Sequence, residues 1–281
     1  MTGAVLVTGA TGTVGSSVVA ELLAAGEPVR AATTRPRPRA DGAEPVRLDF
    51  GDPGTWEPAL DGVDRLFLLR PPAISDVSST LVPVVRLAAR RGVRQVVFLS
   101  LLGVNPAMPH WRVERALAAE GVPHAVLRAA FFAQNLETAY RDDVRDHDRI
   151  RLPAGQGRTS FVDTRDVAAV AALALRDPAA HAGATHVLTG PEALSWSDVA
   201  SLLSATLGRP VRYQPIGFLA HRRELLAAGY PSDYATVQLF IAAVARLGFA
   251  ARVTDTVPRL LGRPATPLAD YVADAAGAWR R

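Results

Sequence analysis

Short apolar runs alternate with longer amphipathic stretches over the first two thirds of the chain. The runs are rich in Val, Leu and Ala and are too apolar to have a solvent-exposed face. Such runs are typical of parallel strands that are covered by helices on both sides. We expect strands at residues 4–8, 29–33, 45–49, 65–69, 95–100, 124–128 and 187–189.

Helices are predicted between these strands because apolar residues recur there at helical spacing. Val14, Val18 and Leu22 form one stripe, which Gly26 ends. A second stripe lies within residues 78–91. The alternation predicts an α/β fold, a Rossmann-type doubly wound parallel sheet with its ligand at the carboxyl ends of the strands.

The pattern changes after Pro191, where we expect helices alone, including residues 196–207 and 234–247. Prolines interrupt this part of the chain repeatedly. We therefore expect residues 1–190 to form a nucleotide-binding domain. Residues 191–281 are predicted to form a smaller, mainly helical lobe that closes over the ligand and binds substrate.

Three glycines at intervals of three follow the first predicted strand and lead into the first helix. This arrangement presents backbone N–H groups and the positive end of a helix to a phosphate. Glycine is needed where the backbone approaches a pyrophosphate and where the helix packs closely on the strand. We predict a dinucleotide site, with a plain glycine-rich turn as the alternative. The predicted contacts are Gly9, Thr11, Gly12, Thr13, Val14 and Gly15.

Composition narrows the chemistry, because all 31 basic residues are arginine and the chain has no cysteine. The absence of lysine excludes Schiff bases, a phosphate-loop lysine and the Tyr-x-x-x-Lys pair of many reductases. The absence of cysteine excludes disulfides, thiolate catalysis and cysteine zinc sites, and no other metal-ligand spacing is present. A net charge of +4 with 27 interspersed acids argues against nucleic-acid binding. No apolar run has the length of a membrane span, and we expect a cytoplasmic protein.

Four motifs resemble those of the NmrA-like atypical short-chain dehydrogenases, in order and over nearly the whole chain. The resemblance implies NAD(P)H-dependent reduction of quinones or ketones, or nucleotide sensing without turnover. Antibiotic-tailoring ketoreductases of aromatic polyketide (angucyclinone-type) pathways look similar and also lack the Tyr–Lys pair. The motifs are Thr8-Gly-x-x-Gly-x-x-Gly15, Val29-Arg30-Ala31, Leu127-Arg128-Ala129-Ala130-Phe131-Phe132-x-x-Asn135 and Phe161-Val162-Asp163-Thr164-Arg165-Asp166-Val167-Ala168.

The segment after the second strand is expected to select the nucleotide. An acid there binds the ribose of NAD, whereas arginine binds the 2′-phosphate of NADP. Here Thr34 and Arg35 come first, and no acid occurs before Asp41. Similar proteins have the arginine one place earlier, at the position of Thr34. We predict NADP (NADPH) as cofactor, with Arg35 as the contact to the 2′-phosphate and Arg37 as the second candidate. The alternative is that these arginines only form a solvated basic loop.

The ends of the third and fourth strands supply further expected cofactor contacts. The resemblance places the adenine near Asp49 and Phe50, where a simple turn acid is the alternative. Leu69, Arg70 and Pro71 end the fourth strand and are expected to border the pyrophosphate or the nicotinamide ribose. Arg70 is unusual there. It either pairs with a cofactor phosphate, faces the substrate or is an exposed loop charge.

Ser100 and His110 are the candidate catalytic residues. Ser100 ends the fifth strand, where related reductases hydrogen-bond a substrate carbonyl and the cofactor, and turn formation is the alternative. His110 and Glu114 occupy the positions of the Tyr-x-x-x-Lys pair. They are either a proton donor with its partner or an ordinary pair at helical spacing. Phe131 and Asn135 are expected near the nicotinamide, although aromatic rings in that position are more often core.

The sequence therefore predicts an NADPH-dependent ketoreductase that transfers hydride to a ketone or quinone carbonyl of an aromatic, polyketide-like small molecule. A broad-specificity NAD(P)H quinone reductase and a non-catalytic NAD(P)-binding redox sensor are the alternatives. Without a Tyr–Lys pair, we expect substrate-assisted reduction, in which a neighbouring phenol of the substrate stabilises the carbonyl oxygen. The partner is a small aromatic ketone or quinone, bound by a monomer or homodimer.

Overall fold

The computed structural model describes residues 3–281 and divides into two compact units. The first unit comprises Met1–Ala129 and Thr164–Leu188, and the second comprises Ala130–Asp163 and Thr189–Arg281. The chain passes from the first unit to the second for the last time between Leu188 and Thr189, whereas the sequence suggests a boundary at residue 190. The second unit also takes residues 130–163, because their strands pair with one another and with later strands instead of joining the large sheet.

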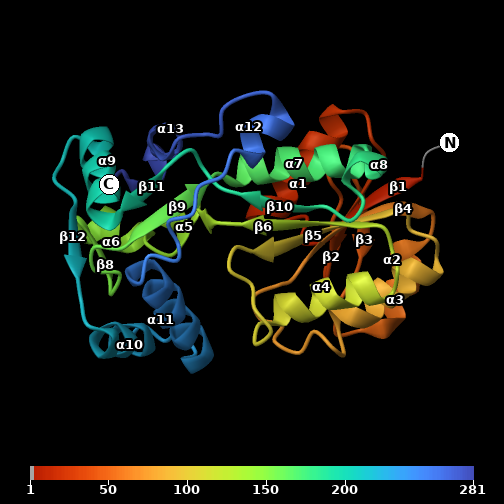
Figure 1. Ribbon diagram of the computed structural model, residues 1–281, viewed down its shortest axis with the longest axis horizontal. Coiled ribbons are helices and arrows are strands. Elements are labelled where there is room, and N and C mark those ends of the chain that lie inside the picture. The colour runs from red at the N-terminus through yellow and green to blue at the C-terminus, as the bar shows by residue number, and fades with distance from the viewer. Residues whose placement is uncertain (1–2) are drawn as a thin grey trace. The chain divides into compact units, whose positions relative to one another are not determined.

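Seven parallel strands form the sheet of the first unit (Figure 1), in the order β10-β6-β5-β4-β1-β2-β3. This arrangement confirms the expected doubly wound α/β fold. All seven predicted strands are present, with ends within two residues of the prediction. The strands are β1 Ala4–Val7, β2 Val29–Thr33, β3 Glu44–Arg47, β4 Val63–Leu69, β5 Gln95–Leu101, β6 His124–Ala129 and β10 Thr185–Leu188.

Helices cover both faces of this sheet (Figure 1). Helices α1 and α7 pack against each other on one face, while α2, α3 and α4 cover the other. The predicted stripe on α3 is buried against the sheet through Val84, Val85 and Ala88. The helices are α1 Thr13–Ala24, η1 Pro53–Thr55, α2 Trp56–Leu60, α3 Leu81–Arg90, α4 Pro109–Ala119, α7 Thr164–Arg176 and α8 Pro178–His181.

The second unit contains two small sheets. Strands β7 Phe131–Phe132, β9 Arg158–Val162 and β11 Ala193–Ser195 form one, and β8 Arg149–Leu152 with β12 Arg212–Pro215 forms the other. The prediction of helices alone after Pro191 is wrong, since β11 and β12 lie there. Both strands are short, and both pair with partners in residues 130–163. Nothing in their local sequence identifies those partners.

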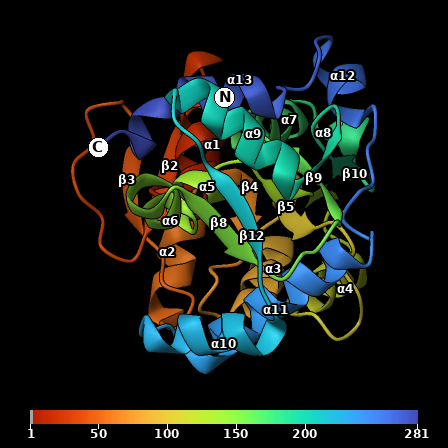
Figure 2. The same ribbon diagram turned by 90° about the vertical axis from the view of Figure 1, so that its left-hand side faces the viewer.

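The helices of the second unit surround these sheets (Figure 2). Its core contains Trp196 and Trp279, both almost fully buried. Helix α9 matches its predicted range, and α11 lies within two residues of it. The helices are α5 Asn135–Thr138, α6 Arg141–His147, α9 Trp196–Leu207, α10 Phe218–Ala227, α11 Ser232–Arg246, α12 Thr256–Leu261, α13 Leu268–Asp274 and η2 Ala276–Trp279.

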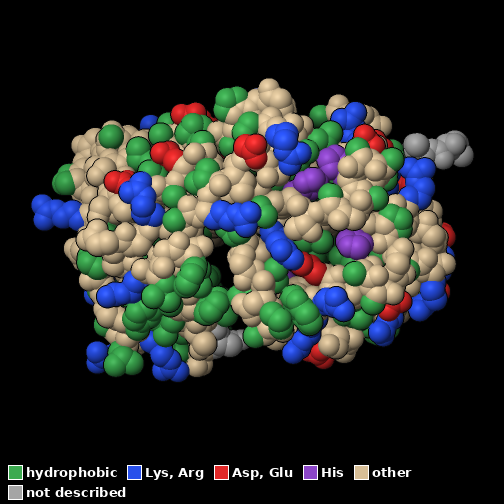
Figure 3. Space-filling view, in the orientation of Figure 1, with side chains coloured by type: hydrophobic (Ala, Val, Ile, Leu, Met, Phe, Trp, Pro, Cys, Tyr) green, Lys and Arg blue, Asp and Glu red, His purple; other side chains and the backbone are tan. Residues whose placement is uncertain are grey.

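Apolar side chains gather on the surface of α10 and α11 (Figure 3). Leu219, Val237 and Phe240 are about half exposed or more, and Phe249 follows α11 with 72% of its surface exposed. No helix within residues 3–281 combines the length and the apolar character needed to cross a bilayer.

Candidate functional site

The order of the strands places a topological switch point between β1 and β4. From this central pair the sheet continues through β2 and β3 on one side and through β5, β6 and β10 on the other. In sheets of this kind ligands bind in the crevice outside the carboxyl ends of the two strands at the switch. The residues that follow these strands are the glycine turn after β1 and Leu69–Pro71 at the end of β4.

The glycines of the turn meet different requirements. Gly9 has a φ of +62°, and a Cβ there would lie 2.8 Å from a methyl carbon of Leu69. A Cβ on Gly15 would lie 2.2 Å from the Gly9 carbonyl oxygen, so the close packing of α1 on the turn requires glycine. At Gly12 the closest neighbouring atom would be that same oxygen, at 3.3 Å. The fold therefore constrains Gly12 least, which leaves its exposed face for a ligand.

The first turn of α1 fits a pyrophosphate. Gly12 is the N-cap, no side chain caps the helix, and its first turn contains no acid. Thr11, Gly12 and Thr13 are exposed, whereas Val14 is buried and offers only its backbone. Uncapped N–H groups at a helix start attract anions through both hydrogen bonds and the helix dipole.

The loop after β2 contains two arginines without a counter-ion. Arg39 is bound to Asp41, with its Nε donating to Oδ1 at 3.0 Å, and this contact lowers the pKa of the Asp41 carboxyl. Arg35 and Arg37 are exposed, and among residues 3–281 neither forms an ion pair. Thr34 beside them is also exposed. Since β2 is next to β1, this loop offers unpaired positive charge at the edge that contains the glycine turn, while its one acid is occupied.

The residues expected near the adenine make contacts within the fold. The Phe50 ring is buried in the core, which leaves only its backbone for a ligand. Asp49 Oδ1 accepts a hydrogen bond from the Gly51 amide at 2.9 Å, and Trp56 Nε1 donates to the Asp49 carbonyl oxygen at 2.8 Å. Asp49 therefore stabilises the turn after β3.

Ser100 lies at the expected strand end but is fully buried. Its hydroxyl donates to Glu114 Oε1 at 2.6 Å, and Arg128 from β6 donates to both oxygens of the same carboxylate, at 3.2 and 2.6 Å. The carboxylate raises the pKa of Arg128. In this arrangement the Ser100 hydroxyl donates its hydrogen to Glu114 and the residue has no exposed surface, so a contact with a substrate carbonyl stays a prediction.

Glu114 pairs with Ser100 and Arg128 and not with His110, so the ordinary pair expected from the helical spacing is not formed. Two strands that are neighbours in the sheet direct Ser100 and Arg128 towards the same helix face. The signal available in the sequence was Arg128 itself, since a cation within the apolar strand His124–Ala129 requires an acid nearby.

His110 begins α4 and contacts Arg70 from the end of β4. Arg70 Nε donates to His110 Nε2 at 3.4 Å. Burial, with a smaller contribution from the Arg70 charge, lowers the pKa of His110 to about 4. Its ring is therefore neutral at pH 7, with Nε2 as an acceptor and the hydrogen on Nδ1. A neutral imidazole is a poor general acid, which favours the expected substrate-assisted reduction over proton donation by His110.

The second unit contains the remaining expected contacts. Phe131 packs edge-on against Phe161 and Trp196 at 5.5 and 5.7 Å between ring centroids, so its ring is part of the core. Asn135 begins α5 and is partly exposed, and among the described residues its side-chain amide has no partner. Gln134, which the sequence also places with Asn135 near the nicotinamide, donates from its side-chain amide to buried Asp163 at 2.9 Å.

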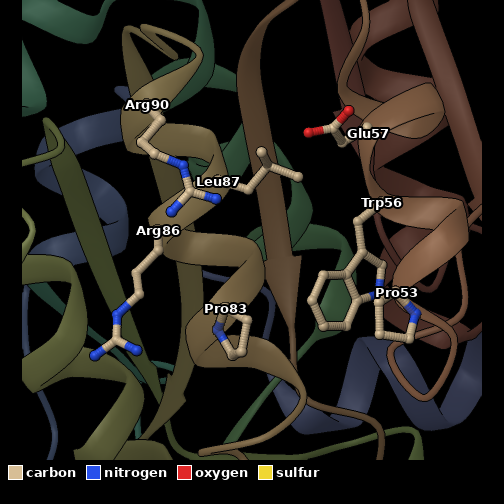
Figure 4. Close-up of a pocket in the computed structure, with 7 residues that line it drawn as sticks. All are labelled: Pro53, Trp56, Glu57, Pro83, Arg86, Leu87 and Arg90. Carbon is tan, nitrogen blue, oxygen red and sulfur yellow. The ribbon is translucent and has the colours of Figure 1, made fainter.

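A surface cavity of about 280 Å³ lies between η1–α2 and α3 (Figure 4). Trp56 and Glu57 face Arg86, Leu87 and Arg90 across it. None of these residues belongs to the glycine turn or to a carboxyl end at the switch point, so the cavity is not the dinucleotide site. Within residues 3–281, no group of three or more His, Cys, Asp or Glu side chains is placed to hold a metal ion.

Comparison with known proteins shows full-length relatives among reductases. The (4-alkanoyl-5-oxo-2,5-dihydrofuran-3-yl)methyl phosphate reductase of Streptomyces griseus is 36% identical over 286 residues, covering 98% of this chain and 99% of that protein. An NAD(P)H azoreductase of Xenophilus azovorans is 34% identical over 285 residues, with the same coverage.

Solved structures agree with this. The NADPH-dependent quinone oxidoreductase of Escherichia coli, crystallised in complex with NADPH, superposes with a TM-score of 0.86 at 26% identity, covering 97% of this chain and 99% of that one. The NmrA-like family model matches residues 1–246. With its parallel sheet, its glycine turn and relatives that extend over the whole length, this chain belongs to the NmrA-like family.

Proposed function

We propose that this protein is an NADPH-dependent reductase that transfers hydride to a quinone or to a similarly conjugated carbonyl of a small aromatic molecule. The observation that carries the proposal is the edge at β1 and β2. There an uncapped helix start and two unpaired arginines lie at neighbouring strand ends. The relatives named above act, by their names, on azo compounds, an oxo-dihydrofuran and quinones.

The cofactor is NADP(H), because the site has separate positive groups for its two phosphate regions. The start of α1 binds the pyrophosphate, with Gly12 allowing close approach, and Arg35 and Arg37 bind the 2′-phosphate. Asp41 is held by Arg39 and does not compete for the ribose. When bound, the reduced nicotinamide supplies a hydride to the acceptor.

The class of acceptor follows from the protonation state of the candidate catalytic groups. Ser100 donates to Glu114, and His110 is neutral, so neither is prepared to protonate a strongly basic alkoxide. A quinone that gains hydride becomes a delocalised phenolate, a much weaker base, which takes its proton from solvent. A polyketide carbonyl beside a phenol is a second acceptor of this kind, because the phenol hydrogen stabilises the developing oxyanion.

Exposed Phe240, Val237 and Leu219 on α10 and α11 provide apolar surface of the kind that binds aromatic molecules. A non-catalytic sensor remains the competing function. The loss of NADPH absorbance is followed with a panel of quinones, hydroxyaryl ketones and simple aryl ketones. This distinguishes a quinone reductase, a reductase of phenolic ketones and a sensor without turnover. We expect turnover with the first two classes, and a sensor gives none with any.

The cofactor assignment is tested with paired arginine variants. We expect Arg35→Ala to weaken NADPH binding by roughly 10- to 100-fold, the effect of losing a charge-assisted phosphate contact, and to leave NADH binding unchanged. Arg86→Ala is the matched control, because exposed Arg86 on α3 is already paired with Glu120 and its loss leaves Asp41 held by Arg39. Fluorescence titration of both nucleotides measures this. Equal losses for NADPH and NADH, or equal effects of the two variants, contradict the assignment.

A further inference from the structure

Arg70 is a cation at the switch point with no counter-ion. It directly follows β4, beside the strand that leads into the glycine turn. Its side chain is partly buried, and burial lowers its pKa. No acid among residues 3–281 lies within ion-pair distance of it, whereas the buried Arg65 on the same strand has both Glu27 and Asp64. A desolvated guanidinium without a carboxylate is costly unless a ligand compensates it.

The guanidinium is nevertheless held firmly. Nη1 donates to the carbonyl oxygens of Pro71, Pro72 and Ile74, at 3.1, 3.1 and 2.5 Å. Nε donates to His110. These contacts use three of the five N–H groups and fix the plane of the group. Among the described residues nothing accepts from Nη2, so its two donors remain available at the carboxyl end of β4.

The neighbouring His110 favours the same ligand. Because Nε2 accepts from Arg70, the ring presents Nδ1–H as a further donor, and no described residue accepts from it. The pair thus contributes donors and one positive charge, with no acceptor left open. Such a set of groups is complementary to an oxyanion such as carboxylate, sulfonate or phosphate.

We propose that Arg70, supported by His110, selects acceptors that contain an anionic group, by binding that group at the end of β4. This inference deepens the proposed reductase function and rests on it for the kinetic part of its test. The anionic group that Arg70 binds belongs to the substrate and not to the cofactor. The cofactor phosphates are already assigned to the start of α1 and to Arg35 with Arg37.

The kinetic test compares naphthoquinone with naphthoquinone sulfonate. We expect Arg70→Gln to reduce kcat/KM for the sulfonate by roughly 10- to 100-fold, mainly through KM, and to change that for naphthoquinone by less than about threefold. Comparing variant with wild type for each quinone cancels their different intrinsic reactivities. Arg112→Gln is the matched control. Arg112 is exposed on α4, so this substitution removes the same charge from a nearby part of the same unit.

A binding test keeps the inference independent of turnover. Naphthalene sulfonate and naphthalene are titrated into the NADP⁺-loaded protein, and we expect only the sulfonate to lose affinity in Arg70→Gln. Thermal melting checks the fold, and Arg70→Lys retains part of the sulfonate preference. Equal losses for both quinones, a loss of NADPH affinity, an equal effect of Arg112→Gln or no effect at all each overturn the proposal. If neither quinone is reduced by wild type while sulfonate binding still depends on Arg70, the proposed function fails and the anion site stands.

Discussion

His110 resists protonation in the folded protein. Its side chain is buried at the start of α4, and its pKa is lowered from 6.5 to about 4. Between these values the unfolded chain binds the proton and the folded chain does not, so the free energy of unfolding falls as the pH drops from about 6.5 to 4. We expect His110→Gln to reduce this slope by up to about 1.4 kcal/mol per pH unit, as measured by urea unfolding across that range.

The same variant distinguishes two roles of the residue. We expect it to retain kcat for an uncharged quinone within about threefold, because a neutral imidazole does not protonate the product. A loss of roughly 10²–10⁴-fold would instead indicate a general acid. A pH slope unchanged from wild type would show that the buried ring is not what makes unfolding easier in acid.

Two glutamates, Glu114 within α4 and Glu120 at its C-cap, pair with arginines in different surroundings. Glu114 is nearly buried between Ser100 and Arg128, whereas Glu120 pairs with exposed Arg86 on α3. We expect Glu114→Gln to lower the free energy of unfolding by about 1–3 kcal/mol, because it leaves Arg128 without its charge partner. Glu120→Gln is the matched control, with an expected change below about 0.5 kcal/mol.

Urea unfolding of both variants measures this difference, and equal effects would contradict the ranking by burial. The Ser100–Glu114–Arg128 contact is also expected to be structural. The loss in free energy of unfolding caused by Glu114→Gln should therefore exceed the rise in activation free energy calculated from its kcat for a quinone. The opposite result would indicate that Ser100 takes part in catalysis.

The central parallel strands were predictable because they are buried on both faces, which requires continuous apolar runs in the sequence. The short strands β11 and β12 were not, because their pairing partners lie in residues 130–163. The glycine turn was likewise predictable from local spacing. The roles of Ser100 and Glu114 depend on Arg128 from a neighbouring strand, and a linear pattern does not specify which side chains meet across a sheet.

At the scale of the whole molecule, the end of the chain completes the core of the second unit. Trp279 is fully buried there, and its Nε1 donates to the Leu136 carbonyl oxygen at 3.1 Å. Arg209 donates to the Trp279 carbonyl oxygen at 2.9 Å. We expect Trp279→Ala to cost about 3–5 kcal/mol of stability in this unit, through the cavity that it creates.

Limited proteolysis measures this effect by region. Faster cleavage is expected within residues 130–163 and 189–281, while residues 3–129 remain protected. Trp111→Ala is the control, because Trp111 lies in α4 of the first unit and is only partly buried. Uniform acceleration of cleavage along the chain would instead mean that the two units unfold as one.

The discontinuity of the first unit has a consequence for synthesis on the ribosome. Its sheet lacks the edge strand β10, and α1 lacks its neighbour α7, until translation has passed Leu188. About sixty residues separate that point from the end of β6, which corresponds to about 3–12 s of elongation. During this interval the edge of β6 that later pairs with β10 is open, so the nascent chain is most prone to pair with other chains between these two positions.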